Sequence, residues 1–260
     1  ALAQYLTAAF LIDFDTVLDP RLFILSVSTL LIAAGGYIIN DYYDVKIDLI
    51  NKPQRVVIGK SITRRYAILF HTLLSFAGVA LGLVLSWKIA AVNFVSVTIL
   101  WFYSNTLKRQ PFVGNLVVAL LTGVSIWLVD SLYKTGHMLI ICYASFAFFI
   151  TLIREIIKDM EDLKGDETFG CKTLPIVWGI RRTKYFIYGI LVVFLLTIAM
   201  INFFLEDLPL RYFVVFLFVP MLWLVVRLSG ADTKRDFTWL SSFCKLILLL
   251  GILSMAFISN

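Results

Sequence analysis

The segment RLFILSVSTLLIAAGGYIINDYYDVKID, residues 21–48, joins a long apolar run to a dense row of polar and acidic residues. About 20 apolar residues in succession are enough for a helix to cross the roughly 30 Å hydrocarbon layer of a bilayer. Residues 21–40 meet that requirement, and the acidic residues begin where the apolar run ends. We therefore predict a membrane-spanning helix with a charged site at one of its ends.

The composition extends this prediction to the whole chain. Of the 260 residues 60% are hydrophobic and 15% are charged, whereas ordinary soluble domains carry about 25% charged residues. The longest runs are apolar nearly all round rather than along one stripe, which argues against a soluble helical bundle. We predict an all-α polytopic membrane protein, one domain over residues 1–260, with nine transmembrane helices at roughly 1–12, 21–40, 66–87, 89–107, 112–130, 137–157, 184–205, 210–228 and 238–259.

The first apolar run, residues 1–12, is too short to cross a bilayer alone. We expect it to be the truncated part of a longer first helix. No basic segment and small-residue cleavage site precede it, so it does not resemble a signal peptide.

The basic residues, lysine and arginine, are concentrated in every second connection between the predicted spans. The connections after even-numbered spans hold 18 of the 23 basic residues, whereas those after odd-numbered spans hold one each. Loops rich in these residues stay in the cytoplasm. We therefore predict that the connections after even-numbered spans are cytoplasmic, and one basic residue, Lys245, is left inside the last span.

The distribution of basic residues, cysteines and histidines disfavours several function classes. The net charge of +6 does not indicate nucleic-acid binding, because the basic residues lie in short loops rather than along one continuous face. The cysteines have no CxxC spacing, and there are too few histidines for a zinc or haem site. Redox and transition-metal chemistry are therefore not expected from Cys142, Cys171, Cys244, His71 and His137.

A first acidic cluster, NDYYDVKID at 40–48, lies at the inner end of the second span. Asn40, Asp44 and Asp48 are spaced i, i+4 and i+8, so on a continuing helix they form one oxygen-bearing stripe with Asp41 beside it. Like charges at this spacing repel one another, and a row of them at the membrane edge is costly. A bound cation is the natural way to stabilise such a row.

A second acidic cluster lies at the inner end of the sixth span, where Asp159, Asp162 and Asp166 stand at i, i+3 and i+7. This spacing again predicts one helical face. Mg²⁺ prefers oxygen ligands and commonly combines one or two carboxylates with substrate phosphate oxygens. Two facing clusters would thus hold a diphosphate through Mg²⁺, although solvated loop acids balanced by nearby Lys and Arg are the alternative for each cluster.

Basic residues that could bind a diphosphate lie close to both clusters. Arg55 follows the first cluster in NKPQR, residues 51–55, and Lys158 lies inside the second. In the connection after the fourth span, Tyr103 and Ser104 could supply hydroxyl groups, and Lys108 and Arg109 could supply cations. For this last pair, simple positive-inside anchoring is an equally good explanation.

These motifs resemble those of the UbiA superfamily of intramembrane prenyltransferases. NDYYDVKID at 40–48 and NKPQR at 51–55 are similar to the signatures NDxxDxxxD and NKPxR of that superfamily, and KDMEDLKGD at 158–166 is similar to KDxxDxxGD. KTLP at 172–175 follows the second motif, and Val56 stands where the family often has proline. The resemblance covers essentially the whole chain.

The resemblance implies a central cavity in a ring of nine helices, with a Mg²⁺-bound prenyl diphosphate and a lipophilic acceptor as substrates. It implies metal ligands on both motifs, catalytic roles for the central aspartates and Lys158, and diphosphate contacts from basic and amide side chains. The metal set is Asn40, Asp41, Asp44, Asp48, Asp159, Asp162 and Asp166, the catalytic set is Asp44, Asp162 and Lys158, and the diphosphate-binding set is Arg55, Lys158, Asn40 and Lys108.

Within the superfamily, REIIKDMEDLKGDETFGCKTLP at 154–175 looks most like the branch that attaches geranylgeranyl to geranylgeranylglyceryl phosphate in ether-lipid synthesis. An aromatic acceptor, as in quinone or chlorophyll synthesis, is the alternative. A CDP-alcohol phosphotransferase lacks support because neither acidic cluster contains a DG…AR start, and a cation-coupled transporter would place its charges nearer the bilayer midplane. The sequence leaves prenyl length, the general base and oligomeric state open.

Overall fold

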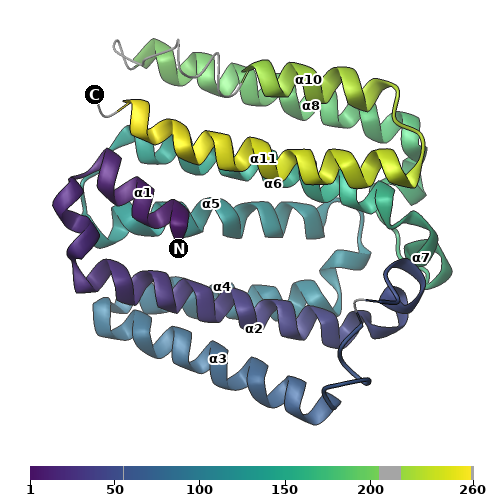
Figure 1. Cartoon of the computed structure of the whole chain (residues 1–260), viewed down its shortest axis with the longest axis horizontal. Helices are drawn as coiled ribbons and strands as arrows, with labels where there is room; N and C mark the ends of the chain where they lie inside the picture. Colours follow the sequence, from purple (N-terminus) through teal and green to yellow (C-terminus); the bar gives the residue numbers. More distant parts are fainter. Residues whose placement is uncertain (55, 205–217, 259–260) are drawn as a thin grey trace.

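The computed structural model describes residues 1–54, 56–204 and 218–258, and these residues fold almost entirely into helices (Figure 1). Two short 3₁₀ helices, η1 and η2, lie between longer α-helices. The elements are α1 Leu2–Leu11, η1 Phe14–Leu18, α2 Pro20–Asn51, α3 Arg64–Leu85, α4 Trp87–Asn105, η2 Leu107–Arg109, α5 Val113–Tyr133, α6 Met138–Glu161, α7 Leu163–Thr168, α8 Leu174–Phe204, α10 Val219–Ser229 and α11 Lys234–Ile258.

Seven of these helices are long and apolar enough to cross a membrane, and α1 and α10 are shorter apolar helices. The prediction of a polytopic helical membrane protein is confirmed. The seventh predicted span differs in its start, because α8 begins at Leu174, ten residues before the predicted 184. A backbone break at Gly179, with φ of 78°, separates this first turn from the rest of α8. Residues 210–217 of the eighth predicted span lie outside the described residues.

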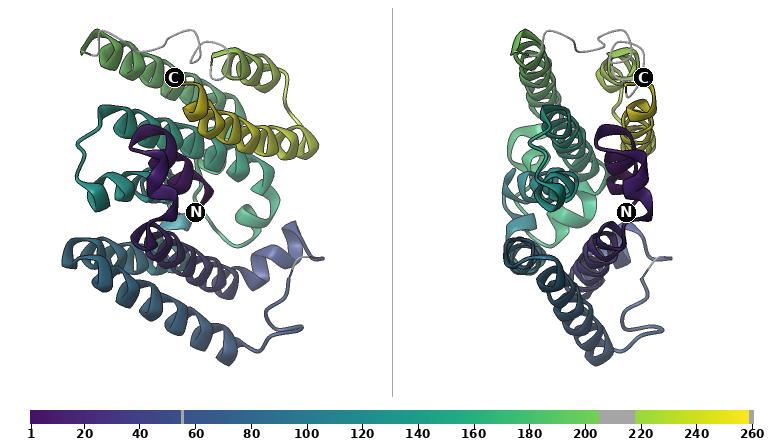
Figure 2. Two further views of the ribbon diagram at one scale, coloured as in Figure 1. Left: turned by 60° about the vertical axis from the view of Figure 1, so that its left-hand side comes forward. Right: turned by 90° about the vertical axis from the view of Figure 1, so that its left-hand side faces the viewer.

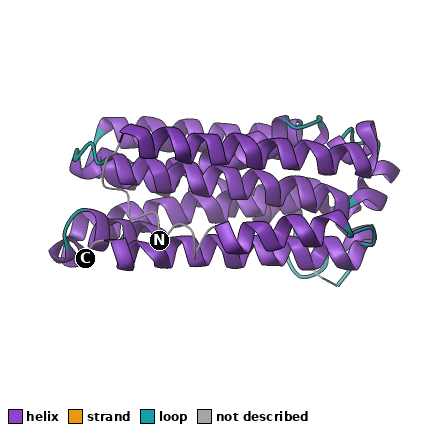
Figure 3. Ribbon diagram, turned by 90° about the horizontal axis from the view of Figure 1, so that it is seen from above, coloured by secondary structure: helices purple, strands orange, loops and turns teal. Residues whose placement is uncertain are grey.

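The long helices run roughly parallel to one another (Figure 3). In Figure 1, α2, α3 and α4 pack together on one side and α6, α8, α10 and α11 on the other, with α5 between them. Both views of Figure 2 place α2 and α3 side by side. In α6, 67% of the most apolar stretch is buried, compared with 17% in α3. The bundle is therefore centred on α6, and α3 exposes most of its apolar side chains on the outside of the bundle.

Helix α2 carries the first acidic cluster without interruption. Its start is fixed by Asp19, whose side chain accepts a hydrogen bond from the backbone N–H of Arg21, and by Pro20 at the first helical position. The helix then continues to Asn51, beyond all of the acidic residues of the cluster. The prediction of one oxygen-bearing stripe on a continuing helix is confirmed.

The second acidic cluster departs from the predicted single helical face. Helix α6 ends at Glu161, Asp162 adopts φ −94° and ψ 7°, and the six-residue helix α7 starts at Leu163. Asp159 therefore lies on α6, whereas Asp166 lies on α7. The spacing of i, i+3 and i+7 is compatible with one helix, but here it spans a helix break that directs the chain back toward α2.

The connections after α2, α4, α6 and α10 meet at the same end of the bundle, on the right in Figure 1. This is the end where α7 and η2 lie. The two acidic clusters, far apart in the sequence, are thereby brought to one end of the molecule.

Candidate functional site

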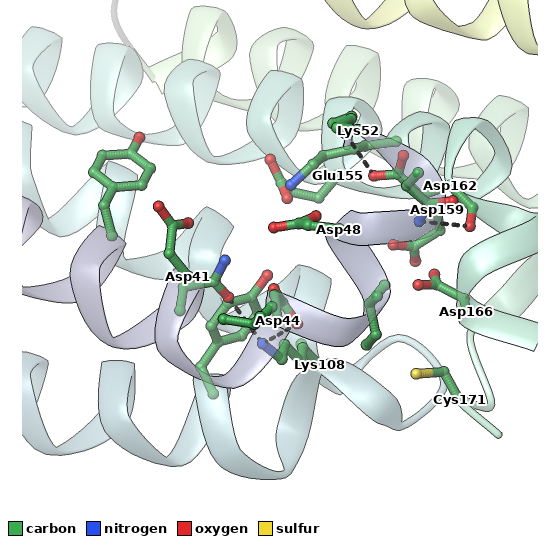
Figure 4. Close-up of a pocket in the computed structure, with 18 of the residues that line it drawn as sticks. Asp41, Asp44, Asp48, Lys52, Lys108, Glu155, Asp159, Asp162, Asp166 and Cys171 are labelled. Atoms are coloured by element: carbon green, nitrogen blue, oxygen red, sulfur yellow. Dashed lines mark hydrogen bonds and ion pairs between the residues drawn. The ribbon is translucent and has the colours of Figure 1, made fainter. Parts of the chain in front are cut away.

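A cavity of about 360 Å³ lies at this end between α2, η2, the start of α5 and the α6–α7 junction (Figure 4). Both acidic clusters point into it. The predicted residues that line it are Asn40, Asp41, Asp44, Asp48, Lys108, Lys158, Asp159, Asp162 and Asp166. Arg55 lies outside the described residues, so its predicted diphosphate contact stays a prediction.

Lys108 reaches the first cluster from the turn between α4 and α5. Its Nζ lies 2.6 Å from a carboxylate oxygen of Asp44 and donates a 3.2 Å hydrogen bond to Oδ1 of Asn40. The side chains of Lys108 and Asp44 are 10% and 15% exposed. Gly114 permits this approach, since a Cβ there would stand 2.7 Å from the Cα of Lys108. The fold thus brings Lys108, but not the exposed neighbour Arg109, into the cavity wall.

The second cluster has a matching lysine and an amide partner. Nζ of Lys52, just past the end of α2, lies 2.8 Å from Oδ2 of Asp162. Asn115 on α5 donates a 2.8 Å hydrogen bond to Oδ2 of Asp159. Each acidic cluster therefore has one carboxylate paired with a lysine from a different segment, as the dashed lines in Figure 4 show.

Asn51, the last residue of α2, fastens the two clusters together. Its Nδ2 donates a 3.1 Å hydrogen bond to the backbone carbonyl of Asp162, and its Oδ1 accepts one of 3.1 Å from the backbone N–H of Gly165. A Cβ at Gly165 would stand 2.4 Å from Nδ2 of Asn51. A side chain at position 165 would therefore force the Asn51 carboxamide to shift and would disturb its two hydrogen bonds.

Burial changes the proton affinity of two groups in the connecting segments. Burial, and then repulsion from Asp162 and Asp44, raises the pKa of Asp166 to about 7. Burial lowers the pKa of Lys108, an effect that the Asp44 carboxylate opposes. A cation bound among the carboxylates would favour their charged forms.

The carboxylates offer the donor atoms that Mg²⁺ prefers. In the described part of the chain, no three His, Cys, Asp or Glu side chains are grouped closely enough to hold a metal ion by themselves. Such an open arrangement fits Mg²⁺, which commonly takes one or two carboxylates and completes its shell with phosphate oxygens and water. Oδ1 of Asp162 is buried without a hydrogen-bond partner, so an oxygen ligand is available at the cavity.

Some cavity residues were not assigned a role from the sequence. Lys52 and Asn51 belong to the NKPQR motif, and their place in this motif could have indicated a role at the site. Asn115 falls near the start of a predicted apolar span, where a carboxamide needs a partner. Tyr103 lines the cavity as one of the possible hydroxyl donors, whereas Ser104 hydrogen-bonds within α4. The unassigned cavity residues that carry polar groups are Tyr37, Asn51, Lys52, Asn115, Arg154, Glu155 and Cys171.

The family model described as the UbiA prenyltransferase family matches residues 1–256. The chain belongs to the UbiA prenyltransferase family. Membership makes this protein an integral membrane prenyltransferase, rather than a transporter or a CDP-alcohol phosphotransferase. The two motifs that resembled the superfamily signatures are the same motifs that line the cavity.

The chain is also similar to curated proteins and, in its fold, to solved structures. The chain is 37% identical over 231 residues to a digeranylgeranylglyceryl phosphate synthase from Saccharolobus solfataricus, covering 86% of this chain and 82% of the relative. It is 22% identical to a structure described as giving insights into digeranylgeranylglyceryl phosphate synthase in membranes, with a TM-score of 0.74 over 99% of this chain and 90% of the other.

A UbiA homologue from Archaeoglobus fulgidus bound to DMAPP and Mg²⁺ has the same fold. Its TM-score is 0.74 at 16% identity, over 98% of this chain and 94% of the other. At this identity the similarity establishes the fold, which agrees with the helical arrangement in Figure 1.

Proposed function

We propose that this UbiA family member transfers a geranylgeranyl group from geranylgeranyl diphosphate to the hydroxyl of geranylgeranylglyceryl phosphate in a Mg²⁺-dependent reaction. The name of the relative from Saccharolobus solfataricus, at 37% identity, supports this donor and acceptor. The product is a glycerol phosphate with two ether-linked isoprenoid chains. One observation carries the proposal of prenyl transfer: two carboxylate clusters from separate helices line one cavity, and each is paired with a lysine.

The cavity residues divide into two roles in this proposal. Oxygens of Asn40, Asp41, Asp44, Asp48, Asp159, Asp162 and Asp166 would hold Mg²⁺, in combination with oxygens of the diphosphate. When bound, Mg²⁺ supplies positive charge that neutralises the diphosphate as it leaves. Lys108, Lys158 and Arg55 would bind the other diphosphate oxygens, since charged donors make strong hydrogen bonds to phosphate.

The reaction breaks the allylic C–O bond of the donor and forms an ether C–O bond to the acceptor. Lys108 and Lys158 stabilise the negative charge that develops on the departing diphosphate. The electron-deficient prenyl carbon is captured by the acceptor hydroxyl, and the hydroxyl proton passes to the released diphosphate, an anion at the reaction site, as the ether forms. Burial of the cavity strengthens these charge interactions, because the effective dielectric constant is lower there than in water.

We also assign the membrane arrangement within this proposal. The seven long helices together with α1 and α10 would form the ring of nine helices typical of the family. The cavity would face the cytoplasm. A labelling experiment tests the side. Glu167→Cys on α7 should react with an impermeant maleimide only after permeabilisation of cells, whereas Asp15→Cys on η1 should react in intact cells. The opposite pattern would reverse the topology.

The acceptor is tested with purified protein and radiolabelled geranylgeranyl diphosphate. We expect labelled product with geranylgeranylglyceryl phosphate, and none when Mg²⁺ is removed by chelation. The control acceptors are 4-hydroxybenzoate, dihydroxynaphthoate and chlorophyllide. Product formed only with one of these aromatic or ring-bearing acceptors would refute the proposed acceptor. It would still support the proposal of prenyl transfer.

A further inference from the structure

A second cavity of about 420 Å³ adjoins the first, between the segment after α2, the end of α6 and the first half of α11. Its volume is within the range of about 300–1,000 Å³ for small-molecule sites. Lys52, Arg154 and Lys158 line both cavities, so the two share a wall. The roles proposed for the Asp clusters leave this second cavity without a ligand.

The described lining of the second cavity is strongly basic. Lys52 and Arg154 have carboxylate partners, Asp162 and Glu155, but Nε of Arg154 is buried without a hydrogen-bond partner. Lys234 donates to the backbone carbonyl of Asn51 at 3.1 Å. In the described residues no carboxylate forms an ion pair with Lys234 or Lys245. Five basic residues thus line the cavity against one acid, Glu161, and these are Lys52, Arg154, Lys158, Lys234 and Lys245.

Polar residues continue along one face of α11. Thr238 and Ser241 follow Lys234 at successive turns, and Lys245 comes one turn later. Lys245 lies about 16 Å from the start of α11 at 1.5 Å per residue. It is the basic residue that the alternation of charges left inside the last span. Charged residues within a span commonly face a cavity and take part in function.

We infer that this second cavity binds the phosphate group of the glycerol phosphate acceptor, an inference that rests on the proposed function. Lys234 and Lys245 bind the phosphate oxygens as charged donors, and the hydroxyls of Thr238 and Ser241 are additional hydrogen-bond donors. The shared wall of Lys52, Arg154 and Lys158 separates this phosphate from the donor diphosphate and compensates both negative charges.

The chemistry of the acceptor requires the two anion sites to be neighbours. In a glycerol phosphate that carries one ether chain, the free hydroxyl is at most two carbons from the carbon that bears the phosphate. The hydroxyl must reach the prenyl carbon that is bonded to the diphosphate. A phosphate site that shares residues with the diphosphate site meets both conditions, and a distant site would not.

The experiment compares two acceptors, geranylgeranylglyceryl phosphate and the same lipid without phosphate, using the full chain in lipid nanodiscs. Lys245→Met and Lys234→Met should each raise the KM for the phosphorylated acceptor about tenfold. The KM for geranylgeranyl diphosphate and for the acceptor without phosphate should stay within about twofold. Lys46→Met is the matched control, because Lys46 is an exposed lysine at the same end that lines neither cavity.

An unchanged KM for the phosphorylated acceptor, or an equal change for both acceptors, would overturn the inference. An unchanged donor KM shows that a variant is correctly folded. If Lys245→Met does not fold, Lys245→Gln replaces it. Direct binding of geranylgeranylglyceryl phosphate without donor and Mg²⁺ separates this inference from the proposed function. Wild-type binding that weakens in Lys245→Met supports the phosphate site even if no product forms, whereas absence of binding refutes it.

Discussion

The two acidic clusters carry similar carboxylates but differ in the backbone structure that holds them. The first lies on the uninterrupted helix α2, and the second spans the break between α6 and α7. Asp44 is paired with Lys108 from the α4–α5 turn, and Asp162 with Lys52 from beyond α2. A continuous helix holds the backbone of its acidic residues in place by its own hydrogen bonds, whereas a broken one needs contacts from outside.

Asn51 provides those outside contacts. Its two hydrogen bonds to the Asp162 carbonyl and the Gly165 N–H tie the break to the end of the first helix. The position of the second cluster therefore depends on the first, while the first does not depend on the second to the same degree. This asymmetry can be tested by substitutions at each cluster.

Removing either central carboxylate should have the largest effect. Asp44→Ala and Asp162→Ala should each lower Mg²⁺-dependent diphosphate release by at least about 10²–10³-fold, because each removes charge that holds the metal and the leaving group. Glu167→Gln on α7, an exposed acid outside the cavity, is the control. Wild-type turnover in both Asp variants would refute the mechanism, and turnover in one would show that the clusters do not act as a pair.

Loosening the second cluster should have the next largest effect. Gly165→Ala places a Cβ against Asn51, and Asn51→Ala removes both hydrogen bonds to the break, so we expect roughly 1–3 kcal/mol of lost stability or transition-state binding in each. Measured kcat/KM should fall about 10- to 100-fold. A double-mutant cycle of Gly165 and Asn51 should show strong coupling. Additive effects would mean that the contact does not position the cluster.

Removing the lysine partners should affect donor binding more than protein folding. Lys108→Met should raise the KM for prenyl diphosphate about tenfold, and Lys52→Met somewhat less. Lys108 is the more buried of the two lysines, at 10% exposure against 23%, and also binds Asn40. Gly114→Ala, which displaces the backbone of Lys108, should change the KM in the same direction. An unchanged donor KM in Lys108→Met would exclude a diphosphate contact.

The smallest effect is expected at Arg109. Its side chain is exposed and lies outside the cavity lining, although it directly follows Lys108. Arg109→Met should change kcat and the donor KM by less than about twofold. A tenfold loss in this variant would contradict the distinction between the two neighbouring cations.

Periodicity predicted the first cluster better than the second. On α2 the i, i+4, i+8 spacing and the true structure agree, because nothing interrupts the helix before Asn51. At the second cluster the same kind of spacing predicted one helix, but tertiary contacts stabilise a break at Asp162. The close contact between Gly165 and Asn51 is visible only once the two residues are placed side by side. Local pattern cannot reveal a contact between residues so far apart in the chain.

From the sequence, Lys108 and not Arg109 was assigned to the diphosphate-binding set, but simple anchoring remained an equally good explanation for both residues. Adjacent basic residues after a span satisfy the positive-inside rule equally well. The turn through η2 and the close packing on Gly114 direct Lys108 toward Asp44. The contacts of Lys52 and Asn115 could likewise be found only from the fold, since their partners come from other helices.

The pairing of each cluster with a distant lysine or amide also sets an order for biosynthesis. Asn40 and Lys108 are 68 residues apart, and Lys52 and Asp162 are 110 apart. At about 5–20 residues per second, a ribosome takes several seconds to make each missing partner. During that interval the nascent chain holds α2 with its carboxylate row uncompensated, so this end of α2 must stay in contact with water until the later helices are inserted beside it.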